Sequence, residues 1–533
     1  MKTKSTSGQK HKSLLAKGLS LSVLTLGSRI LGLIREMTKA KFLGATHLSD
    51  AYGIAFMIPN LFRRLFAENS VSVAFIPTFK NHIEDDSEEG KKKTRNFVNA
   101  TFTLVSFCTV LFVTLGIIFT PFILRIFFKG DANSTLNEAV ILTRIMFPYL
   151  VVISIAAFFQ GILNGLKIFS PSGFTPILFN LIVIISTYVL SPFTKNPARS
   201  MAIGVITGGT VQCLFQLPFV LKNGYTIRLT SLKSAFTNEG TKKVLALVGP
   251  TIIGMAGYQL NDIVSSALAT HAGEGVVSSL QYSLRLQELI LGICAVTIGT
   301  VILPDLTGFA KKSQWEKFNG MLTLAIKLIA FISIPITFYS LVMGENLITL
   351  VFASGKFDED AILMTKEVFN FHIIGLFFIA VNRIVSQAFY AQQNTKSPTI
   401  AGLINFGVNI LFASAFVFSL KGKGIALALT IASFVNTVML FVFLKKTPTI
   451  DVKSVIVSSI FYCAKLIVFS LAAALSIYFL RIPLVDFFAG HKRIISQGIP
   501  VAVTALIFAT VGIGLMALTK DSLLKIAVRK FKK

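Results

Sequence analysis

Arginines lie inside segments of this chain that are otherwise apolar enough to cross a membrane. The stretch PNLFRRLFAENSVSVAFIPTF, residues 59–79, carries Arg63 and Arg64 side by side, and Glu68 follows one helical turn later. The other arginines in apolar segments are Arg29, Arg35, Arg285 and Arg383. An arginine at the centre of a membrane helix costs about 2.5–3.5 kcal/mol, so this set would cost on the order of 15 kcal/mol or more if it faced lipid. These side chains are therefore expected to line a water-filled cavity and to meet an anionic group.

Carboxylates accompany two of these arginines at helical spacing. Glu68 follows Arg64 by four residues and Glu288 follows Arg285 by three, and both spacings place the two side chains on one helix face. Each pair is expected either to balance charge within a cavity or simply to lock neighbouring helices together.

Two more carboxylates lie close to the first arginines. Glu36 is seven residues after Arg29, shares its helix face and is expected to be its partner, whereas Arg35 points to another side of the helix. Asp50 begins the second apolar segment and can pair with one of the arginines. Because the carboxylates are outnumbered, the cavity is expected to keep a net positive charge. The planar fork of the guanidinium group suits phosphate best among anions.

No catalytic constellation accompanies these charges. The segment VFASGKFDED, residues 351–360, contains Gly-Lys but lacks the first glycine of a phosphate-binding P-loop. No Ser-His-Asp set and no metal-ligand spacing occurs in the sequence. The chain is therefore expected to be a non-enzymatic protein without a cofactor.

The other unusual side chains are interpreted as structural. His372 is expected to be buried or interfacial, and Lys327 and Lys465 are expected to extend to the membrane interface. The cysteines are interpreted as small buried hydrophobes rather than as disulfide partners or metal ligands. They are Cys108, Cys213, Cys294 and Cys463.

The elements that must position these charges are membrane-spanning helices. Of the 533 residues, 53% are hydrophobic and only 14% charged, and the mean hydropathy is +0.73, which indicates an all-α polytopic membrane protein. About fourteen transmembrane helices are expected from hydropathy. Their ranges are 14–36, 49–79, 97–124, 138–165, 173–192, 199–221, 243–270, 276–305, 318–343, 361–391, 398–419, 424–444, 454–480 and 494–519.

Lysine and arginine are distributed unequally between the loops. The net charge of +27 is explained by an excess of these residues on one side of the membrane, so no nucleic-acid partner is expected. The bias predicts that both termini lie in the cytoplasm, as a tail over residues 1–13 and a basic tail over 520–533. The segments 80–96 and 222–242 are then cytoplasmic connectors. The N-terminus is expected to remain attached, because no signal-peptide cleavage site follows its apolar stretch.

A weak internal repeat divides the chain. The segments FFQGILNGLKIFSP and VSQAFYAQQNTKSP both run from a long span into a polar turn, and they end at Pro171 and Pro398. Repeats of this kind are typical of transporters. The sequence therefore predicts two six-helix lobes, residues 14–221 and 243–444, with the helices of 454–519 outside the repeat.

Four stretches resemble the MurJ (MviN) family of lipid II flippases, which act in bacterial peptidoglycan synthesis. They are SRILGLIRE, LSDAYGIAFMIPNLFRRLFAENSVSVAFIPTF, RIMFPYLVVISIAAFFQGILNGLKIFSPSGFTPILFN and LRLQELILGICAVTIGTVILPDL. The family belongs to the multidrug/oligosaccharidyl-lipid/polysaccharide exporter superfamily. The resemblance covers nearly the whole chain and implies two six-helix lobes around a central cavity.

The resemblance also implies a substrate and residue roles. The substrate is undecaprenyl diphosphate carrying a disaccharide-pentapeptide, moved across the bacterial cytoplasmic (inner) membrane by alternating access. The implied cavity residues are Arg29, Arg35, Arg63, Arg64, Arg285, Arg383, Asp50, Glu68 and Glu288. The family has Lys or Arg where Arg383 stands, and Glu36 replaces a commoner Asp. The helices of 454–519 would form a groove for the lipid tail.

Some members of the family bind sodium, which would serve as a coupling ion. The oxygens available here belong to Asp262, Asn405, Asn409 and Thr430. Ordinary hydrogen bonding between helices is the alternative for these polar groups. The expected partners are lipid II and membrane lipids, with the chain functional as a monomer and in contact with cell-wall synthesis proteins.

Three other functions are open to this sequence. A multidrug/ion antiporter of the same superfamily would favour a pocket rich in carboxylates and aromatic rings. A polysaccharide-unit flippase cannot be distinguished by fold alone. A non-transporting membrane scaffold would not need a surplus of buried cations.

Overall fold

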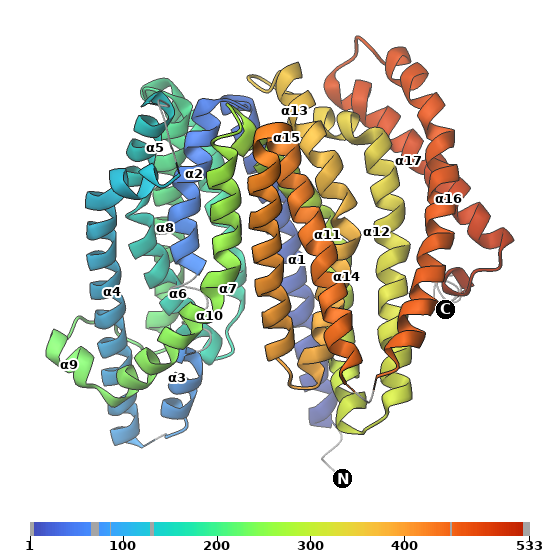
Figure 1. The fold of residues 1–533 in the computed structure, drawn as a ribbon. Helices are drawn as coiled ribbons and strands as arrows, with labels where there is room; N and C mark the ends of the chain where they lie inside the picture. Colours follow the sequence, from blue (N-terminus) through green and yellow to red (C-terminus); the bar gives the residue numbers. More distant parts are fainter. Residues whose placement is uncertain (1–4, 65–73, 86, 128–132, 448–449, 526–533) are drawn as a thin grey trace. The chain divides into compact units, whose positions relative to one another are not determined.

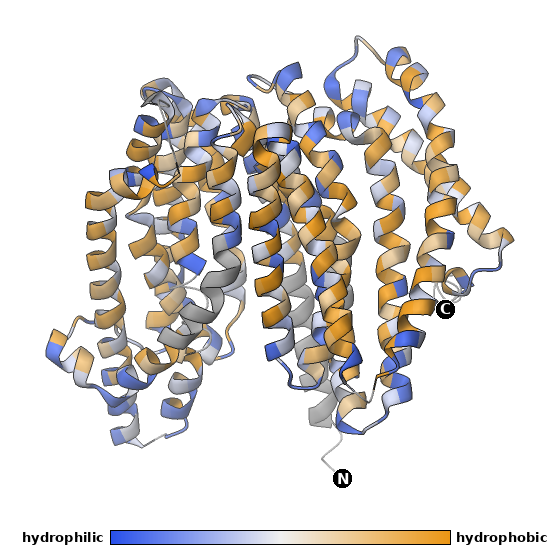
Figure 2. Cartoon of the chain, in the orientation of Figure 1, coloured by the Kyte–Doolittle hydropathy of each residue, from blue (hydrophilic) through white to orange (hydrophobic). Residues whose placement is uncertain are grey.

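The computed structural model describes residues 5–64, 74–85, 87–127, 133–447 and 450–525, and it gives only the backbone path of 5–22, 133, 249–260 and 293–301 (Figure 1). Within these residues the regular structure is helical and contains no strand, which confirms the all-α class. Nine of the described helical segments are long and apolar enough to cross a membrane. In Figure 2 the helices α4 (Glu88–Arg125) and α16 (Val452–Phe487) are hydrophobic along most of their length.

The chain divides into two compact units that are continuous in sequence, Met1–Thr270 and His271–Lys533. The other helices of the first unit are α1 (Ser5–Leu43), α2 (His47–Phe62), α3 (Ile76–Ile83), α5 (Asn133–Met146), α6 (Tyr149–Gly165), α7 (Ser170–Leu190), α8 (Pro197–Lys222), α9 (Leu232–Thr237) and α10 (Glu239–Ala269). The other helices of the second unit are α11 (Val276–Lys311), α12 (Trp315–Phe352), α13 (Glu359–Ile374), α14 (Leu376–Ala391), α15 (Lys396–Lys445) and α17 (Arg493–Leu518).

The boundary between the units differs from the linker at 222–242 that the sequence suggested. Helix α10, expected to open the second lobe, groups with the first unit, where it contacts α2, α3, α4 and α9. The hydroxyl of Thr270, just after α10, also donates a hydrogen bond to the Phe127 carbonyl oxygen at 2.6 Å. The linker itself contains the short helix α9, which packs on α4.

Two of the expected spans are broken helices. The span 138–165 consists of α5 and α6, separated at Pro148, which has no N–H for the helical ladder. The span 361–391 consists of α13 and α14, separated at Gly375. Both breaks fall in the fourth span of the predicted repeat, so the two halves of the chain share this feature.

One further boundary differs from the sequence expectation, and another is described only in part. The helix expected over 49–79 is described at its two ends, by α2 up to Phe62 and by α3 from Ile76, and residues 65–73 lie outside the described chain. The connector expected over 80–96 is largely helical. Ser87 caps α4 by accepting a hydrogen bond from the Gly90 N–H at 3.0 Å, and Glu88 and Glu89 stabilise the helix's first turn.

The turn between the spans 398–419 and 424–444 is confirmed. Helix α15 carries a residue with left-handed backbone geometry, Lys421, at φ 51° and ψ −133°. Gly424 follows, and a Cβ there would lie 2.6 Å from the Phe416 carbonyl oxygen. The chain therefore reverses at a point where a larger residue than glycine does not fit.

Helices α7 and α8 of the first unit pack closely through two glycines one helical turn apart. A Cβ on Gly204 would lie 3.1 Å from the Val183 Cα, and one on Gly208 would lie 3.2 Å from the Phe179 carbonyl oxygen. Such a pair of small residues lets two backbones approach in a membrane, where dispersion contacts and hydrogen bonds replace the hydrophobic effect.

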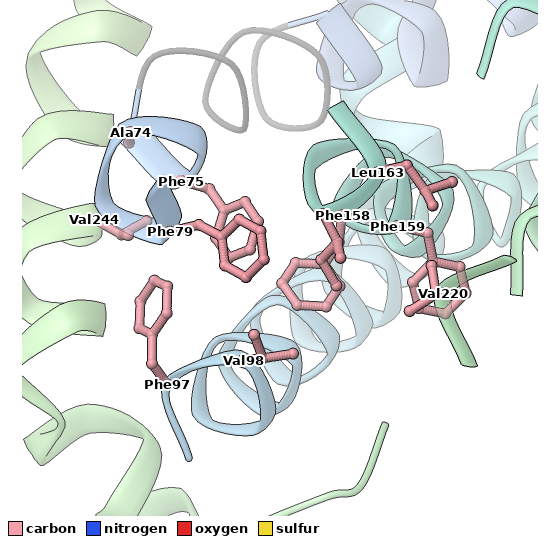
Figure 3. Close-up of a cluster of buried hydrophobic side chains, with 11 residues drawn as sticks. Ala74, Phe75, Phe79, Phe97, Val98, Phe158, Phe159, Leu163, Val220 and Val244 are labelled. Atoms are coloured by element: carbon pink, nitrogen blue, oxygen red, sulfur yellow. The ribbon is translucent and has the colours of Figure 1, made fainter. Parts of the chain in front are cut away.

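A cluster of phenylalanines fixes α3 within the first unit. The Phe75 ring lies 5.4 Å from that of Phe79, 5.6 Å from that of Phe97 and 4.9 Å from that of Phe158. All four side chains are buried, and Figure 3 shows Phe75, Phe79 and Phe158 turned toward one another. These contacts join the residues around α3 to α4 and α6.

In the second unit, α16 and α17 pack against α12 (Figure 1). The Tyr339 hydroxyl donates to the Val501 carbonyl oxygen at 2.7 Å, and Asn346 donates to Gln497 at 2.9 Å. Arg481 donates to the Val342 carbonyl oxygen at 2.8 Å. The two helices outside the repeat are thus attached to one helix of the second unit by both apolar and polar contacts.

Candidate functional site

Arg35 lies in a partly buried polar cluster of the first unit. Its guanidinium donates to Glu36 at 2.7 Å and to Asn180 of α7 at 3.2 Å. The rings of Phe56 and Phe179 each have their centroid 5.8 Å from the guanidinium carbon, a distance typical of cation–π contacts. Arg35 is therefore held on several sides by α1, α2 and α7.

Lys39 and Asp50 extend this cluster. Lys39 is only 3% exposed, and its ammonium lies 5.9 Å from the centroid of the Tyr52 ring. Glu36 and Asp50 attract its charge, and Arg35 repels it. Asp50 is 5% exposed and stands in the first turn of α2, where the helix dipole favours a negative charge.

The pairing expected between Arg29 and Glu36 is wrong. Glu36 accepts its hydrogen bond from Arg35, the neighbouring residue in sequence. Arg29 is partly exposed and makes no hydrogen bond or ion pair with any residue that the structure describes. The backbone just before it is fixed, because Asn180 donates to the Ser28 carbonyl oxygen at 3.2 Å.

The arginine pair at the end of α2 is partly exposed. The Arg63 Nε donates to the Asn60 side-chain oxygen at 2.9 Å, one turn earlier on the helix. Arg64 follows it, and Glu68, its predicted partner, lies outside the described residues. The predicted pairing of Arg64 with Glu68 therefore stays a prediction.

The predicted pairing of Arg285 with Glu288 on α11 is confirmed. An Arg285 Nη lies 3.4 Å from a Glu288 carboxylate oxygen, and the Glu288 side chain is 61% exposed. An ion pair this exposed contributes about 1 kcal/mol or less. The Arg285 Nε is buried and has no acceptor among the described residues. Arg383, on α14, is exposed.

The polar residues considered for sodium are divided between the units. Asp262 is exposed on α10 of the first unit, whereas Asn405, Asn409 and Thr430 belong to α15 of the second. The Asn405 side-chain oxygen is buried and accepts no hydrogen bond from the described residues. The Thr430 hydroxyl donates to the Phe371 carbonyl oxygen at 2.7 Å, which leaves its lone pairs available.

An apolar cavity of about 290 Å³ lies between α12, α16 and α17. Phe331 and Tyr339 line it from α12, Phe469 from α16, and Ala509 and Gly512 from α17. The α16–α17 pair thus forms an apolar recess where the sequence suggested a groove for a lipid tail.

The predictions for the residues interpreted as structural, His372, Lys327 and Lys465, have different outcomes. His372 is buried as expected, with Nδ1 2.6 Å from the Ser283 hydroxyl oxygen. Lys465 was expected to extend to an interface, but its ammonium is paired with Asp521 at 2.7 Å. Lys327 lies 5.8 Å from the centroid of the Tyr462 ring, so its charge contacts an aromatic face.

The cysteine prediction is correct in part. The three cysteines whose side chains are described, Cys108, Cys213 and Cys463, carry free thiols. Cys108 is exposed, which corrects its assignment as a buried residue, because it lies on a face of α4 that no described part of the chain covers. Cys294 lies among the residues whose side chains are not described.

Two residues of the Arg35 cluster were missed by the sequence reasoning. Lys39 follows the predicted span 14–36, so it was counted as a loop charge, yet α1 continues as a helix to Leu43. Asn180 carries no charge and lay within a long motif without a distinguishing signal. Lys39 is three residues after Glu36 in the sequence. If the first helix had been predicted to continue beyond Glu36, this spacing would have placed the two side chains on one helix face, at pairing distance.

Comparisons with known proteins agree on one family. A family model described as "Lipid II flippase MurJ" matches residues 39–498. The chain is 45% identical over 523 residues to a "Probable lipid II flippase MurJ" of Treponema pallidum (strain Nichols), and the match covers 98% of each protein.

Solved structures support the same fold. A structure titled "Lipid II flippase MurJ, inward closed conformation" matches with a TM-score of 0.77 and 26% identity, over 95% of this chain and 99% of that one. An inward-facing multidrug resistance MATE family transporter of the MOP superfamily matches with a TM-score of 0.67, over 80% of this chain and 95% of that one. At 15% identity the transporter shares the fold alone. Both the family model and the near-complete match at 45% identity establish that the chain belongs to the MurJ family of lipid II flippases.

Proposed function

We propose that this membrane protein is a lipid II flippase, which moves undecaprenyl-diphosphate-linked peptidoglycan precursor from the inner to the outer leaflet of the bacterial cytoplasmic membrane. Family membership supports the substrate, and the family's inward closed structure supports alternating access. No bond in the substrate is formed or broken, so the chain works as a transporter and not as an enzyme.

The observation that carries the proposal is the buried Arg285 Nε, which has no acceptor among the described residues. A buried donor without a partner costs about 1–3 kcal/mol, more when it is charged, and a diphosphate oxygen would satisfy it. Arg29, likewise without a partner in the described chain, is the proposed counterpart in the first unit. We assign both arginines to the diphosphate of the substrate.

The arginines at the end of α2 are assigned to the same substrate. Arg63 and Arg64 are partly exposed and adjacent in sequence, so they place two positive charges at the end of α2. Arg383 is the corresponding exposed cation on α14. Glu68 and Glu288 are assigned to charge balance.

The apolar cavity between α12, α16 and α17 is the proposed site for part of the lipid tail. Its lining is almost wholly apolar, as an isoprenoid chain requires. The headgroup would then cross through the two-lobe core while the tail stays in contact with hydrocarbon. We further propose that the chain acts as a monomer, that both termini are cytoplasmic, and that cell-wall synthesis proteins are its neighbours.

Sodium is the proposed coupling ion. The neutral oxygens of Asn405, Asn409 and Thr430, all on α15, would hold it. The buried Asn405 oxygen, which accepts no hydrogen bond from the described residues, fits this assignment, because sodium prefers oxygen ligands.

The decisive experiment is depletion of this protein in its own cells, followed by measurement of lipid II in each leaflet with an externally added hydrolase that cleaves exposed lipid II. We expect lipid II to accumulate on the inner leaflet and cleavage to fall. An unchanged distribution would contradict the proposal. Export of cationic drugs that falls on depletion, with lipid II unaffected, would favour the antiporter alternative.

A further inference from the structure

Lys39 is a buried cation for which the proposed function supplies no role. It is 3% exposed, whereas Lys41, two residues later on the same helix, is exposed and lies against the Tyr188 ring at 4.9 Å. Lysine is almost never buried unless it is paired. Successive helical positions two apart point to nearly opposite sides, so the two lysines have separate environments.

The groups around Lys39 form a neutral set. Among the described residues of this set, Arg35 and Lys39 carry two positive charges and Glu36 and Asp50 carry two negative charges, so these four charges sum to zero. Tyr52 of α2 and Tyr149 of α6 are further titratable groups that interact with Arg35. Removing the Lys39 charge would leave one buried carboxylate uncompensated.

The cluster is linked to Arg29 by a short series of contacts. Glu36 accepts from Arg35 at 2.7 Å, Arg35 donates to Asn180 at 3.2 Å, and Asn180 donates to the Ser28 carbonyl oxygen at 3.2 Å. Ser28 directly precedes Arg29. A change in the orientation of Glu36 would therefore propagate to the backbone that presents Arg29.

We propose that Lys39 is a positioning residue for the headgroup-binding arginines, acting by neutralising Asp50 and Glu36 so that Glu36 and Asn180 hold Arg35 and the backbone at Arg29. The proposal rests on the proposed lipid II function. Neither the sequence spacing of the arginines nor their exposure indicates this role for Lys39. Lys39 itself does not contact substrate in this account.

The test compares Lys39→Met, Lys39→Arg, Asp50→Asn and the double variant Lys39→Met/Asp50→Asn with the unmodified full-length protein. Lys41→Met is the matched control, because that lysine is exposed on the same helix. Two quantities are measured from pH 6 to pH 8 in detergent: the melting temperature without ligand and the affinity for purified lipid II.

Lys39→Met is expected to melt at a lower temperature than the unmodified protein and to bind lipid II about tenfold or more weakly, since it leaves a buried charge without its partner. Both defects should be larger at pH 8 than at pH 6, because a buried uncompensated carboxylate takes up a proton as the pH falls. Lys39→Arg and the double variant should recover most of the loss, and Lys41→Met should resemble the unmodified protein.

If Lys39→Met melted at the same temperature as the unmodified protein, or at a temperature lowered by the same amount at every pH, the claim that Lys39 neutralises buried carboxylates would be wrong. The expected melting pattern with unchanged lipid II affinity would overturn the positioning role. Failure of the unmodified protein to bind lipid II would overturn the proposed function and with it the positioning role, while the ligand-free melting data would still decide the charge balance.

Discussion

The Lys465 ammonium lies 2.7 Å from a carboxylate oxygen of Asp521, three residues beyond the end of α17. The same carboxylate accepts backbone N–H hydrogen bonds from Leu523 at 2.9 Å and Leu524 at 3.3 Å. Leu523 and Leu524 pack into an apolar cluster with Leu466. The contact therefore fastens the chain after α17 to the side of α16.

Asp521→Asn is expected to destabilise the protein in a pH-dependent way. Burial opposes the Asp521 charge, but the hydrogen bond from Lys465 and those from the Leu524 and Leu523 N–H groups outweigh it and lower its pKa. A lowered folded-state pKa gives a stabilisation that is complete above the unfolded value of about 3.9 and is lost as the pH falls through the folded value.

The free energy of unfolding of Asp521→Asn should therefore be about 1.5–3 kcal/mol lower than that of the unmodified protein at pH 7, as for a charged hydrogen bond. The difference should shrink in acid, below the aspartate range. Thermal melting in detergent at pH 7 and in acid below the aspartate range measures this difference. Asp486→Asn is the control, because Asp486 is exposed. A difference independent of pH would contradict the ion-pair interpretation.

Arg285→Lys is expected to bind lipid II more weakly than the unmodified protein, although it keeps the charge. The Arg285 Nε is a buried donor that a lysine cannot reproduce, and each charged hydrogen bond lost is worth roughly 1.5–3 kcal/mol. The affinity for purified lipid II should fall roughly ten- to a hundredfold. Arg285→Ala should fall further. If Arg285→Lys and the unmodified protein bound lipid II with equal affinity, Arg285 would contribute only its positive charge and no specific hydrogen bond.

Gly204→Ala is expected to lower the stability of the first unit. Its Cβ would lie 2.9 Å from the Ser186 Cβ and 3.1 Å from the Val183 Cα, so α7 and α8 must separate. Overpacking of this kind costs about 1–3 kcal/mol. Melting temperature in detergent measures the effect. Gly320→Ala is the control, because nothing lies within 4 Å of a Cβ there, and it should be neutral or stabilising.

Ala509→Trp is expected to abolish transport while the protein still inserts, because the indole would fill the apolar cavity beside α12. Leu506→Trp, at a position 69% exposed on the same helix, is the matched control. Deletion of residues 454–533 should likewise leave an inserted core without activity. Growth support in depleted cells at equal expression is the measurement. Full activity of Ala509→Trp or of the deletion would exclude an essential role for this site.

Both termini are expected in the cytoplasm, because lysines and arginines concentrate in the loops that this topology places inside. Single cysteines added at each end in a cysteine-free background should react with a membrane-impermeant reagent only after the cells are opened. Labelling of either end in intact cells would reverse the assignment.

Spacing in the sequence predicted contacts within a helix better than contacts between helices. Arg285 and Glu288 were correctly paired, because their contact depends only on helical geometry. Glu36 was assigned to Arg29 by the same rule, yet it pairs with Arg35, whose other partner Asn180 is 145 residues away. Which side chain a carboxylate meets depends on the neighbouring helix, and the pattern along one helix carries no information about it.

Hydropathy predicted the spans but not their interruptions. Apolar residues continue through Pro148 and Gly375, so both broken helices were expected to be unbroken. The end of the first span was placed at Glu36 because charged residues follow, although α1 continues and buries Lys39. A hydropathy average treats every lysine as exposed, and it therefore misses a lysine that carboxylates neutralise.

The continuity of the two compact units in sequence has a consequence for biosynthesis. Every residue of the first unit, including α10, is synthesised before translation of α11 begins. Its internal contacts, such as the glycine packing of α7 on α8 and the hydrogen bond from Thr270 to Phe127, can form while the second half is still being made. Domains generally fold in this N-terminal-first order. A translational pause at about residue 270 would therefore leave a nascent chain that already contains both partners of each of these contacts.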